Sequence, residues 1–295
     1  MKVLYIRSGN GGIDPISTRQ GESLRKVGVD VEYYDIIGKG LGGYLYNIFK
    51  LRKYIKSLKP DLLHAHYSLS GIVTTLTFSH IPIVVSLMGS DVQASNLFIK
   101  FTIRVIKPFW KSTIVKSEEM YLKLGYKKAF IVPNGVDFNN FYPLNLIEAR
   151  EKLNWNQNKK QILFASNPNR PEKNFALAEL ALKQLKKEKI DFELHFLTNI
   201  PMNNMVLYYN AADLLLLTSY YEGSPNVIKE AMACNCPIVA TNVGDVSKVI
   251  GNTKNSHVTS FDDLDVFHKI KEVILTNQRS DGRNNIEDLR CENIA

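Results

Sequence analysis

The chain has few cysteines, no long apolar run and no leader-like start. Its three cysteines are a sparse, odd set, and neither a CxxC pair nor a histidine partner accompanies Cys234 and Cys236. Buried reduced thiols are therefore favoured over metal ligands. Apolar stretches such as Ile81–Met88 are far shorter than the roughly 20 residues that span a bilayer. Because the first apolar run, Val3–Ile6, leads at once into a Gly-rich turn, no signal peptide is predicted. We expect a cytoplasmic protein.

The second half of the chain also lacks any excess of charge. Residues 1–148 hold 19 Lys and Arg against 11 Asp and Glu, whereas the remainder holds 18 of each. Bases interleave with aromatics in segments 44–56 and 98–111. One interpretation is a basic, aromatic helix that contacts the inner face of an anionic membrane. The other is a solvated helix face whose aromatics pack in the core. Nucleic acid binding is not predicted, because no recognised motif accompanies the charge.

Short β-rich runs alternate with helical stretches along both halves of the chain. This alternation predicts parallel sheets with crossover helices, and therefore an α/β protein with two Rossmann-like lobes. Expected strands in the first lobe are Val3–Ile6, Val29–Ile36, Leu62–Ala65, Ile83–Leu87 and Thr113–Val115, and those in the second are Gln161–Ser166, Phe192–Leu197, Leu214–Leu217 and Pro237–Ala240. Helices are expected at about 172–187 and 225–234.

A cluster of turn formers, Val132–Asp137 followed by Phe141–Pro143, separates the two series of strands. We expect an N-terminal lobe at 1–148, which is basic and faces the acceptor, and a C-terminal lobe at 149–295. Ligands of doubly wound sheets bind beyond the carboxyl ends of the strands. Two such lobes are expected to form a cleft, so residues that follow strands are the first candidates for a site.

The segment that follows the expected strand Leu214–Leu217 has the residues of a ligand-binding helix start. Ser224 before Pro225 predicts an N-cap with proline at the first helical position. The free N–H groups of Asn226 and Val227 would then meet a phosphate or sugar oxygen. Just before them, Gly223 would allow a close approach to the backbone. Two carboxylates, Glu222 at the loop tip and Glu230 in the helix, could accept hydrogen bonds from hydroxyls of one polyol diphosphate ligand.

Here the sequence resembles a known family. Glu222 and Glu230, embedded in EGSPNVIKEAMA and followed by PIVAT, resemble the signature of the retaining glycosyltransferases of family 4, which have the GT-B fold. The resemblance implies that Glu222 holds hydroxyls of the transferred sugar and that Glu230 holds the ribose of the nucleotide. It also implies transfer with retention from a nucleotide-diphosphate sugar, without a cofactor or an obligatory metal.

The implied activity is that of a hexosyltransferase type enzyme. Its acceptor would be a glycan or lipid-linked molecule in the synthesis of a surface polysaccharide or glycolipid. Two alternatives stay open. One is a nucleotide-sugar epimerase with the same fold, and the other is a catalytically weak or inactive protein that binds sugar nucleotides.

Further segments resemble the family in both lobes. Ile131–Asp137 is similar to its interlobe PNGVD stretch, and Val243–Asp245 is similar to the turn after its penultimate strand. The family places a lysine and an arginine against the donor diphosphate. Lys173 matches the lysine, and Arg170 is a candidate for the arginine although it lies closer in sequence than is usual. Cations on a loop before a helix suit a diphosphate.

The expected first lobe contributes weaker candidates. Gly11 and Gly12 follow the first strand and resemble the Gly-Gly loop of the family, which approaches the diphosphate. His66 matches the family's HxH strand end, and alternation places it on the same face as His64, which is expected to be buried and hydrogen-bonded. Too few ligands accompany the pair for a metal site. Asp91 is expected to contact the acceptor or sugar, with helix capping as the alternative.

Three departures from the family pattern are visible. Met88 stands where a histidine commonly precedes the GSD sequence. About 14 residues separate Leu197 from Ala212, where most relatives carry a further strand and helix, so the second lobe is expected to be abbreviated. Segment 286–295 is short where relatives run a last helix back to the first lobe, so we expect that return, and with it some interlobe contact, to be missing.

Overall fold

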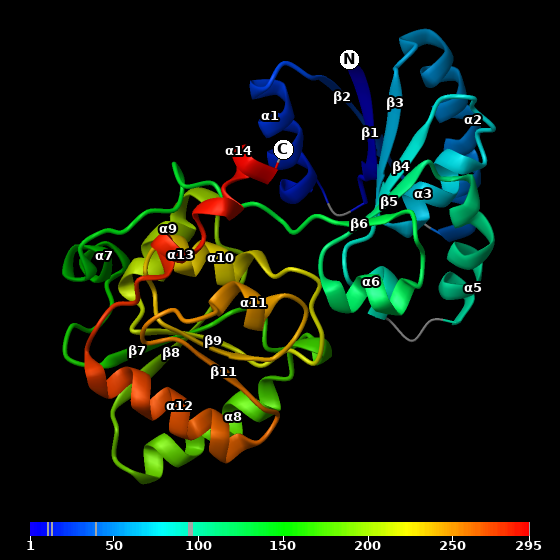
Figure 1. The fold of residues 1–295 in the computed structure, drawn as a ribbon. Coiled ribbons are helices and arrows are strands. Elements are labelled where there is room, and N and C mark those ends of the chain that lie inside the picture. The colour runs from blue at the N-terminus through cyan, green and yellow to red at the C-terminus, as the bar shows by residue number, and fades with distance from the viewer. Residues whose placement is uncertain (11, 13, 39, 94–96, 295) are drawn as a thin grey trace. The chain divides into compact units, whose positions relative to one another are not determined.

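The computed structural model describes residues 1–295 apart from 11, 13, 39, 94–96 and 295, and it divides the chain into two compact units. Unit 1 comprises Met1–Asn134 with Cys291–Ala295, and unit 2 comprises Gly135–Arg290 (Figure 1). Both are parallel-sheet α/β lobes, as the alternation of strands and helices predicts. The chain passes from unit 1 to unit 2 earlier than the expected boundary at 148. The physical reason is that Val136, Phe138 and Phe141 are buried in the core of unit 2.

Unit 1 is built on a six-stranded parallel sheet in the order β2-β1-β3-β4-β5-β6. Its strands are β1 (Lys2–Ser8), β2 (Asp30–Ile36), β3 (Leu62–His66), β4 (Ile83–Ser86), β5 (Ser112–Val115) and β6 (Ala129–Ile131). Its helices are α1 (Pro15–Lys26), α2 (Gly40–Leu58), α3 (Ser68–Thr75), α4 (Ser90–Gln93), α5 (Leu97–Ile106), the 3-10 turn η1 (Lys107–Phe109), α6 (Glu118–Leu124) and α14 (Cys291–Ile294).

Alternation along β1 sends its side chains into two different cores. Leu4 and Ile6 join the core cluster beneath α2, α3 and α5, whereas Val3 and Tyr5 pack toward α1 on the opposite face. On the first face α3 lies between α2 and α5 and contacts both. Helices therefore cover both faces of the sheet, as parallel sheets require.

The C-terminal residues return to unit 1. Helix α14 packs on α1, and Lys26 forms an ion pair with Glu292 at 3.7 Å. The expectation that a returning helix is missing is therefore wrong. The helix is only four residues long, so it has too few apolar positions to show a helical period in the sequence.

Unit 2 has a five-stranded parallel sheet in the order β11-β10-β9-β7-β8. Its strands are β7 (Lys160–Phe164), β8 (Phe192–Phe196), β9 (Leu214–Leu217), β10 (Ile238–Thr241) and β11 (His257–Thr259). Its helices are α7 (Leu146–Leu153), α8 (Phe175–Lys187), α9 (Met205–Ala211), α10 (Asn226–Ala233), α11 (Val246–Ile250), α12 (Asp263–Thr276) and α13 (Gly282–Asn285), with 3-10 turns η2 (Pro171–Lys173), η3 (Met202–Asn204) and η4 (Glu287–Leu289).

The central strand β9 is buried on both faces, which explains its run of four leucines. Leu215 and Leu217 join the core under α9 and α10, and Leu214 and Leu216 join the core under α8 and α12. Between β8 and β9 the described residues form η3 and α9 with no additional strand. Within the described part of the chain, no helix combines the length and apolarity needed to cross a membrane.

Candidate functional site

The loop after β9 leads into α10, which begins one residue later than expected. Pro225 occupies the N-cap position with extended backbone, and α10 starts at Asn226 with no side-chain cap. The assignment of Ser224 as the cap is therefore wrong, because its hydroxyl donates to Asp245 Oδ2 at 2.6 Å instead. The first N–H groups of a helix have no intrahelical acceptor. The first turn of α10 thus presents the N–H groups of Asn226 and Val227 as donors for a ligand.

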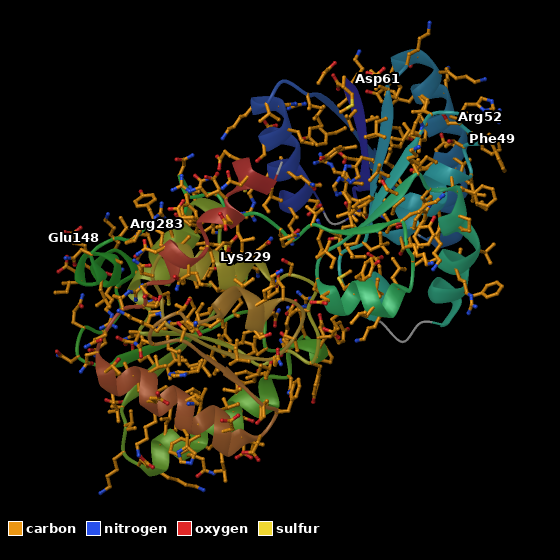
Figure 2. The ribbon with its side chains drawn as sticks, viewed as in Figure 1. Phe49, Arg52, Asp61, Glu148, Lys229 and Arg283 are labelled. Atoms are coloured by element: carbon orange, nitrogen blue, oxygen red, sulfur yellow. The ribbon has the colours of Figure 1, made fainter. Side chains whose placement is uncertain are left out.

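Sequence reasoning missed a buried charged cluster that holds this loop. Lys229 is fully buried on α10, and its Nζ lies 3.0 Å from Asp245 Oδ2 and also donates to the hydroxyl of Ser224 (Figure 2). Burial lowers the pKa of Lys229, while Asp245 and Glu230 act in the opposite direction. The signal in the sequence was a Lys-Glu pair inside the otherwise apolar helix segment 227–233. Separating this pair would leave an uncompensated buried charge, so the pair opposes rearrangement of the Ser224 loop.

Gly244 brings the turn after β10 against the backbone of the same loop. Its φ of +59° is left-handed, and a Cβ there would lie 2.5 Å from Gly223 O and 2.8 Å from Glu222 O. Only glycine permits both the conformation and the approach. The resemblance of Val243–Asp245 to a family turn thus has a structural basis, because this turn packs directly against the backbone of Glu222 and Gly223.

Glu222 and Lys173 meet at the carboxyl edge of the sheet. Lys173 Nζ lies 2.6 Å from Glu222 Oε1, and both side chains are 15% exposed. Ser219 also donates to Glu222 Oε1 at 2.8 Å. The loops after β7 and β9 are further joined by Thr218, whose hydroxyl donates to Lys173 O at 3.1 Å. Two of the residues expected to contact the donor therefore lie in direct contact, at the edge where ligands of doubly wound sheets bind.

Glu230 and Arg170 lie in different surroundings. Glu230 is 2% exposed and accepts a hydrogen bond of 2.8 Å from the hydroxyl of buried Tyr209. Burial raises the pKa of the Tyr209 phenol, and the charge of Glu230 raises it further. Arg170 does not join the Lys173 and Glu222 pair. Its Nε donates to Glu172 Oε1 at 2.7 Å on the exposed surface of the loop.

Two arginines from the C-terminal part of unit 2 hold the far end of α10. Arg279 donates to Cys234 O at 3.1 Å, and Arg283 donates to Ala233 O at 2.9 Å (Figure 2). Cations are favourable at a helix C-terminus because of its partial negative charge. Both ends of α10 are therefore fixed, the start by the Lys229 cluster and the end by the two guanidinium groups.

His64 and His66 of unit 1 are buried on one face, as alternation predicts. The His64 and His66 rings stack with centroids 4.5 Å apart, and His64 Nε2 lies 2.8 Å from the Ser86 hydroxyl, so the expected hydrogen bond of His64 is confirmed. Neither ring nitrogen of His66 has a partner among the described residues. Burial lowers the pKa of His64 to about 3, and it lowers that of His66 well below the ordinary value. Both rings are therefore neutral at pH 7.

Asp91 occupies a structural position in unit 1. Its Oδ1 accepts from Ser68 N at 3.0 Å and from Ser68 Oγ at 2.6 Å, and its Oδ2 accepts from Met88 N at 2.9 Å. These bonds favour the capping alternative, because they occupy the carboxylate at the start of α3. Gly12 has a left-handed φ of +89° with open space where a Cβ would point. Gly11 lies outside the described residues.

Cys234 and Cys236 are buried, and burial raises the pKa of Cys236 to about 11. Among the residues that the structure describes, no three His, Cys, Asp or Glu side chains gather as a metal site would require. The thiols are therefore neutral core residues, as expected.

Comparisons with known proteins cover both units. The family model described as glycosyl transferase 4-like matches residues 5–129, and that described as glycosyl transferases group 1 matches residues 186–288. A teichuronic acid biosynthesis glycosyltransferase of Bacillus subtilis, named as putative, is 28% identical over an alignment of 228 positions, which covers 69% of this chain and 58% of the relative. The chain thus spans less than two thirds of that relative.

Solved structures share the fold. Sucrose-phosphate synthase from Thermosynechococcus elongatus superposes with a TM-score of 0.82 at 18% identity, covering 100% of this chain and 96% of the other. The HepE protein of Anabaena, solved in complex with UDP-glucose, gives a TM-score of 0.77 at 16% identity, covering 100% and 97%. At these identities the likeness establishes the two-lobe architecture alone.

Proposed function

Since the chain belongs to the family 4 type of glycosyltransferases with the GT-B fold, we propose that it transfers a sugar, with retention, from a nucleotide-diphosphate sugar. One observation carries the proposal: Lys173 pairs with Glu222, and Glu222 lies in the loop that leads into the uncapped start of α10. That place combines a cation, a carboxylate and free N–H donors. A sugar diphosphate presents complementary groups, namely phosphate oxygens and hydroxyls.

In this reaction the role of unit 2 is to stabilise the leaving group, which is the diphosphate of the donor. When the bond between the anomeric carbon and the donor phosphate breaks, its electron pair stays on the phosphate oxygen. The N–H groups of Asn226 and Val227, together with Lys173, can stabilise that charge without a metal or a protein nucleophile. Glu222 would accept hydrogen bonds from sugar hydroxyls, and Glu230 from the ribose. Because each group is already fixed by its neighbours, little reorganisation is needed on binding.

The acceptor is proposed to be a glycan or lipid-linked molecule in surface polysaccharide or glycolipid synthesis. The name of the Bacillus subtilis relative, which refers to teichuronic acid, supports this class. The excess of bases in residues 1–148 supports it independently. We place the protein in the cytoplasm at the inner face of the membrane, with unit 1 in peripheral contact with anionic lipid.

Donor binding tests the proposal first. Calorimetric titration with UDP-glucose and GDP-mannose should show micromolar to millimolar affinity for at least one donor, and Glu222→Ala should abolish sugar transfer while the thermal unfolding curve keeps its shape. Glu179→Gln is the matched control, because Glu179 is an exposed carboxylate on α8. Unchanged turnover in Glu222→Ala would refute the role of this site.

Two further outcomes separate the alternatives. Incubation with donor alone would convert it to an epimer if the protein were an epimerase. Donor binding without turnover over a broad panel of glycan and lipid acceptors would identify a binding protein. Retention is tested separately by the anomeric configuration of the product.

A further inference from the structure

The outer surface of the α2, α3 and α5 layer of unit 1 is unusually apolar. This layer covers one face of the sheet (Figure 1). Large apolar side chains that are 53% to 75% exposed lie on α2, on the loop after α3, on α5 and on η1: Leu45, Tyr46, Phe49, Phe78, Phe101, Val105 and Phe109. Phe49 projects from α2 at the outer edge of the unit (Figure 2). So many exposed aromatic rings in one layer mark an interaction surface.

The same layer is positively charged and almost free of acids. Residues 40–111 contain nine Lys and Arg but only two Asp. Asp61 accepts a hydrogen bond from Lys2 N at 2.7 Å, and Asp91 is buried. Of these two carboxylates only that of Asp61 is therefore open to solvent. The partner that complements this surface is therefore both anionic and able to bury aromatic side chains.

A pocket of about 560 Å³ opens on this surface, between the end of α2 and the turn from α3 into β4. Ile55 and Ile81 form its apolar part, and Arg52, Lys56 and Lys59 bring three cations to it. The described lining contains no carboxylate. A guanidinium and two ammonium groups around a partly apolar hollow suit a phosphate attached to an apolar molecule.

The exposed aromatic residue of this pocket, Phe78, has a strained backbone conformation. Phe78 has a left-handed φ of 49° and is 73% exposed, and Lys59 on the same pocket has a φ of 50°. A bulky residue in that region is uncommon and strained. Strain that keeps an aromatic ring in solvent beside three cations is consistent with a binding role for this turn.

We propose that this pocket binds the phosphate of an anionic phospholipid headgroup when the α2, α3 and α5 layer lies on a bilayer. Phe78 then enters the interface, and Arg52, Lys56 and Lys59 surround the phosphate. A soluble phosphate would leave the seven exposed apolar side chains of the layer in water, whereas a bilayer buries them. The proposal rests on the proposed function in one respect, since it names the membrane contact through which unit 1 would reach a lipid-linked acceptor.

Vesicle sedimentation tests the charge requirement with the full chain. Wild type should bind vesicles of 70% phosphatidylcholine and 30% phosphatidylglycerol at low salt and bind pure phosphatidylcholine far more weakly. Arg52→Gln/Lys56→Gln should lower the partition coefficient about 30-fold, because each base near an anionic bilayer contributes about fivefold. Lys183→Gln/Lys187→Gln removes two bases with the same spacing from α8 of unit 2 and should change it less than about threefold. Equal losses in the two variants, or no preference of wild type for the anionic vesicles, would overturn the proposal.

Depth-dependent quenching tests the place of Phe78. The emission that Phe78→Trp adds to that of the native Trp110 and Trp155 should be quenched and shifted to the blue by vesicles that contain brominated lipid. The emission added by Leu180→Trp on α8 should be unaffected. No quenching of the Phe78→Trp emission would contradict insertion of this turn. Neither experiment uses a sugar nucleotide, and a parallel UDP-glucose titration of the same proteins reports the donor site. Failure of the lipid site and failure of the proposed transfer are therefore distinguishable.

Discussion

Replacing Lys229 by Met should destabilise unit 2 more than any exposed substitution. The change removes the cation from Asp245 and leaves a carboxylate that is only 8% exposed. In the described structure its Oδ2 would keep the hydrogen bond from the Ser224 hydroxyl, and its Oδ1 has no partner. Breaking a buried ion pair from one side costs about 3–5 kcal/mol. The double variant Lys229→Met/Asp245→Asn removes both charges and should recover most of that loss, because the amide oxygen can still accept from Ser224.

Urea unfolding measures this effect when it is followed by fluorescence in a Trp110→Phe background, because Trp155 in unit 2 is then the emitting tryptophan. The midpoint should fall for Lys229→Met and return toward wild type for the double variant. Donor affinity should follow a different order. It should stay weak in both variants, because the Ser224 loop loses its Lys229 contact in each. If Lys229→Met unfolds at the wild-type midpoint, or if the double variant is no more stable than the single one, the ion pair does not hold the loop and our reasoning fails.

Three further predictions concern geometry, charge and pH. Gly244→Ala should weaken UDP-glucose binding at least about tenfold, because the new Cβ would displace Gly223. Gly251→Ala is the control: its φ of 49° is also left-handed, but the nearest atom to a Cβ lies 3.7 Å away. It should add strain without changing the Kd in the same titration. Lys173→Gln should raise the donor Kd about 10-fold to 100-fold, because a charge-assisted hydrogen bond contributes about 1.5–3 kcal/mol. Arg170→Gln should change the Kd less than about threefold. Equal effects of the two variants would contradict the assignment of Lys173, and not Arg170, to the diphosphate. Burial lowers the pKa of His66, so the unfolded chain takes up this proton at a higher pH than the folded protein does. Stability should therefore fall as the pH drops below about 6.5, and urea unfolding of His66→Phe at pH 7 and pH 5 should show a smaller loss than wild type.

The sequence was most informative where residues repeat with a short period. The expected runs at Leu62–Ala65 and Leu214–Leu217 match β3 and β9 closely, because alternating or continuous apolar residues reflect burial on one face or on both. The short strands β6 and β11 were not predicted. Each has three residues, which is too few for a periodic pattern, and each pairs at an edge of its sheet.

The candidate site shows the same limit at the level of side chains. The neighbouring residues in the sequence predicted a helix start near Pro225, with Glu222 in the loop before it. The helix α10 does begin at Asn226. It did not predict that Ser224 turns away from the helix to bond Asp245, because that carboxylate lies 21 residues further along the chain. Contacts between separate strand ends depend on how the strands are ordered in the sheet, and local propensity does not contain that information.

A crystal structure of the protein with UDP-glucose would test the central claim most directly. Our account predicts the diphosphate at the N–H groups of Asn226 and Val227 with Lys173 Nζ in hydrogen-bonding distance, and the sugar hydroxyls on the Glu222 carboxylate. Nucleotide bound to unit 2 away from the start of α10, or bound to unit 1 alone, would contradict it.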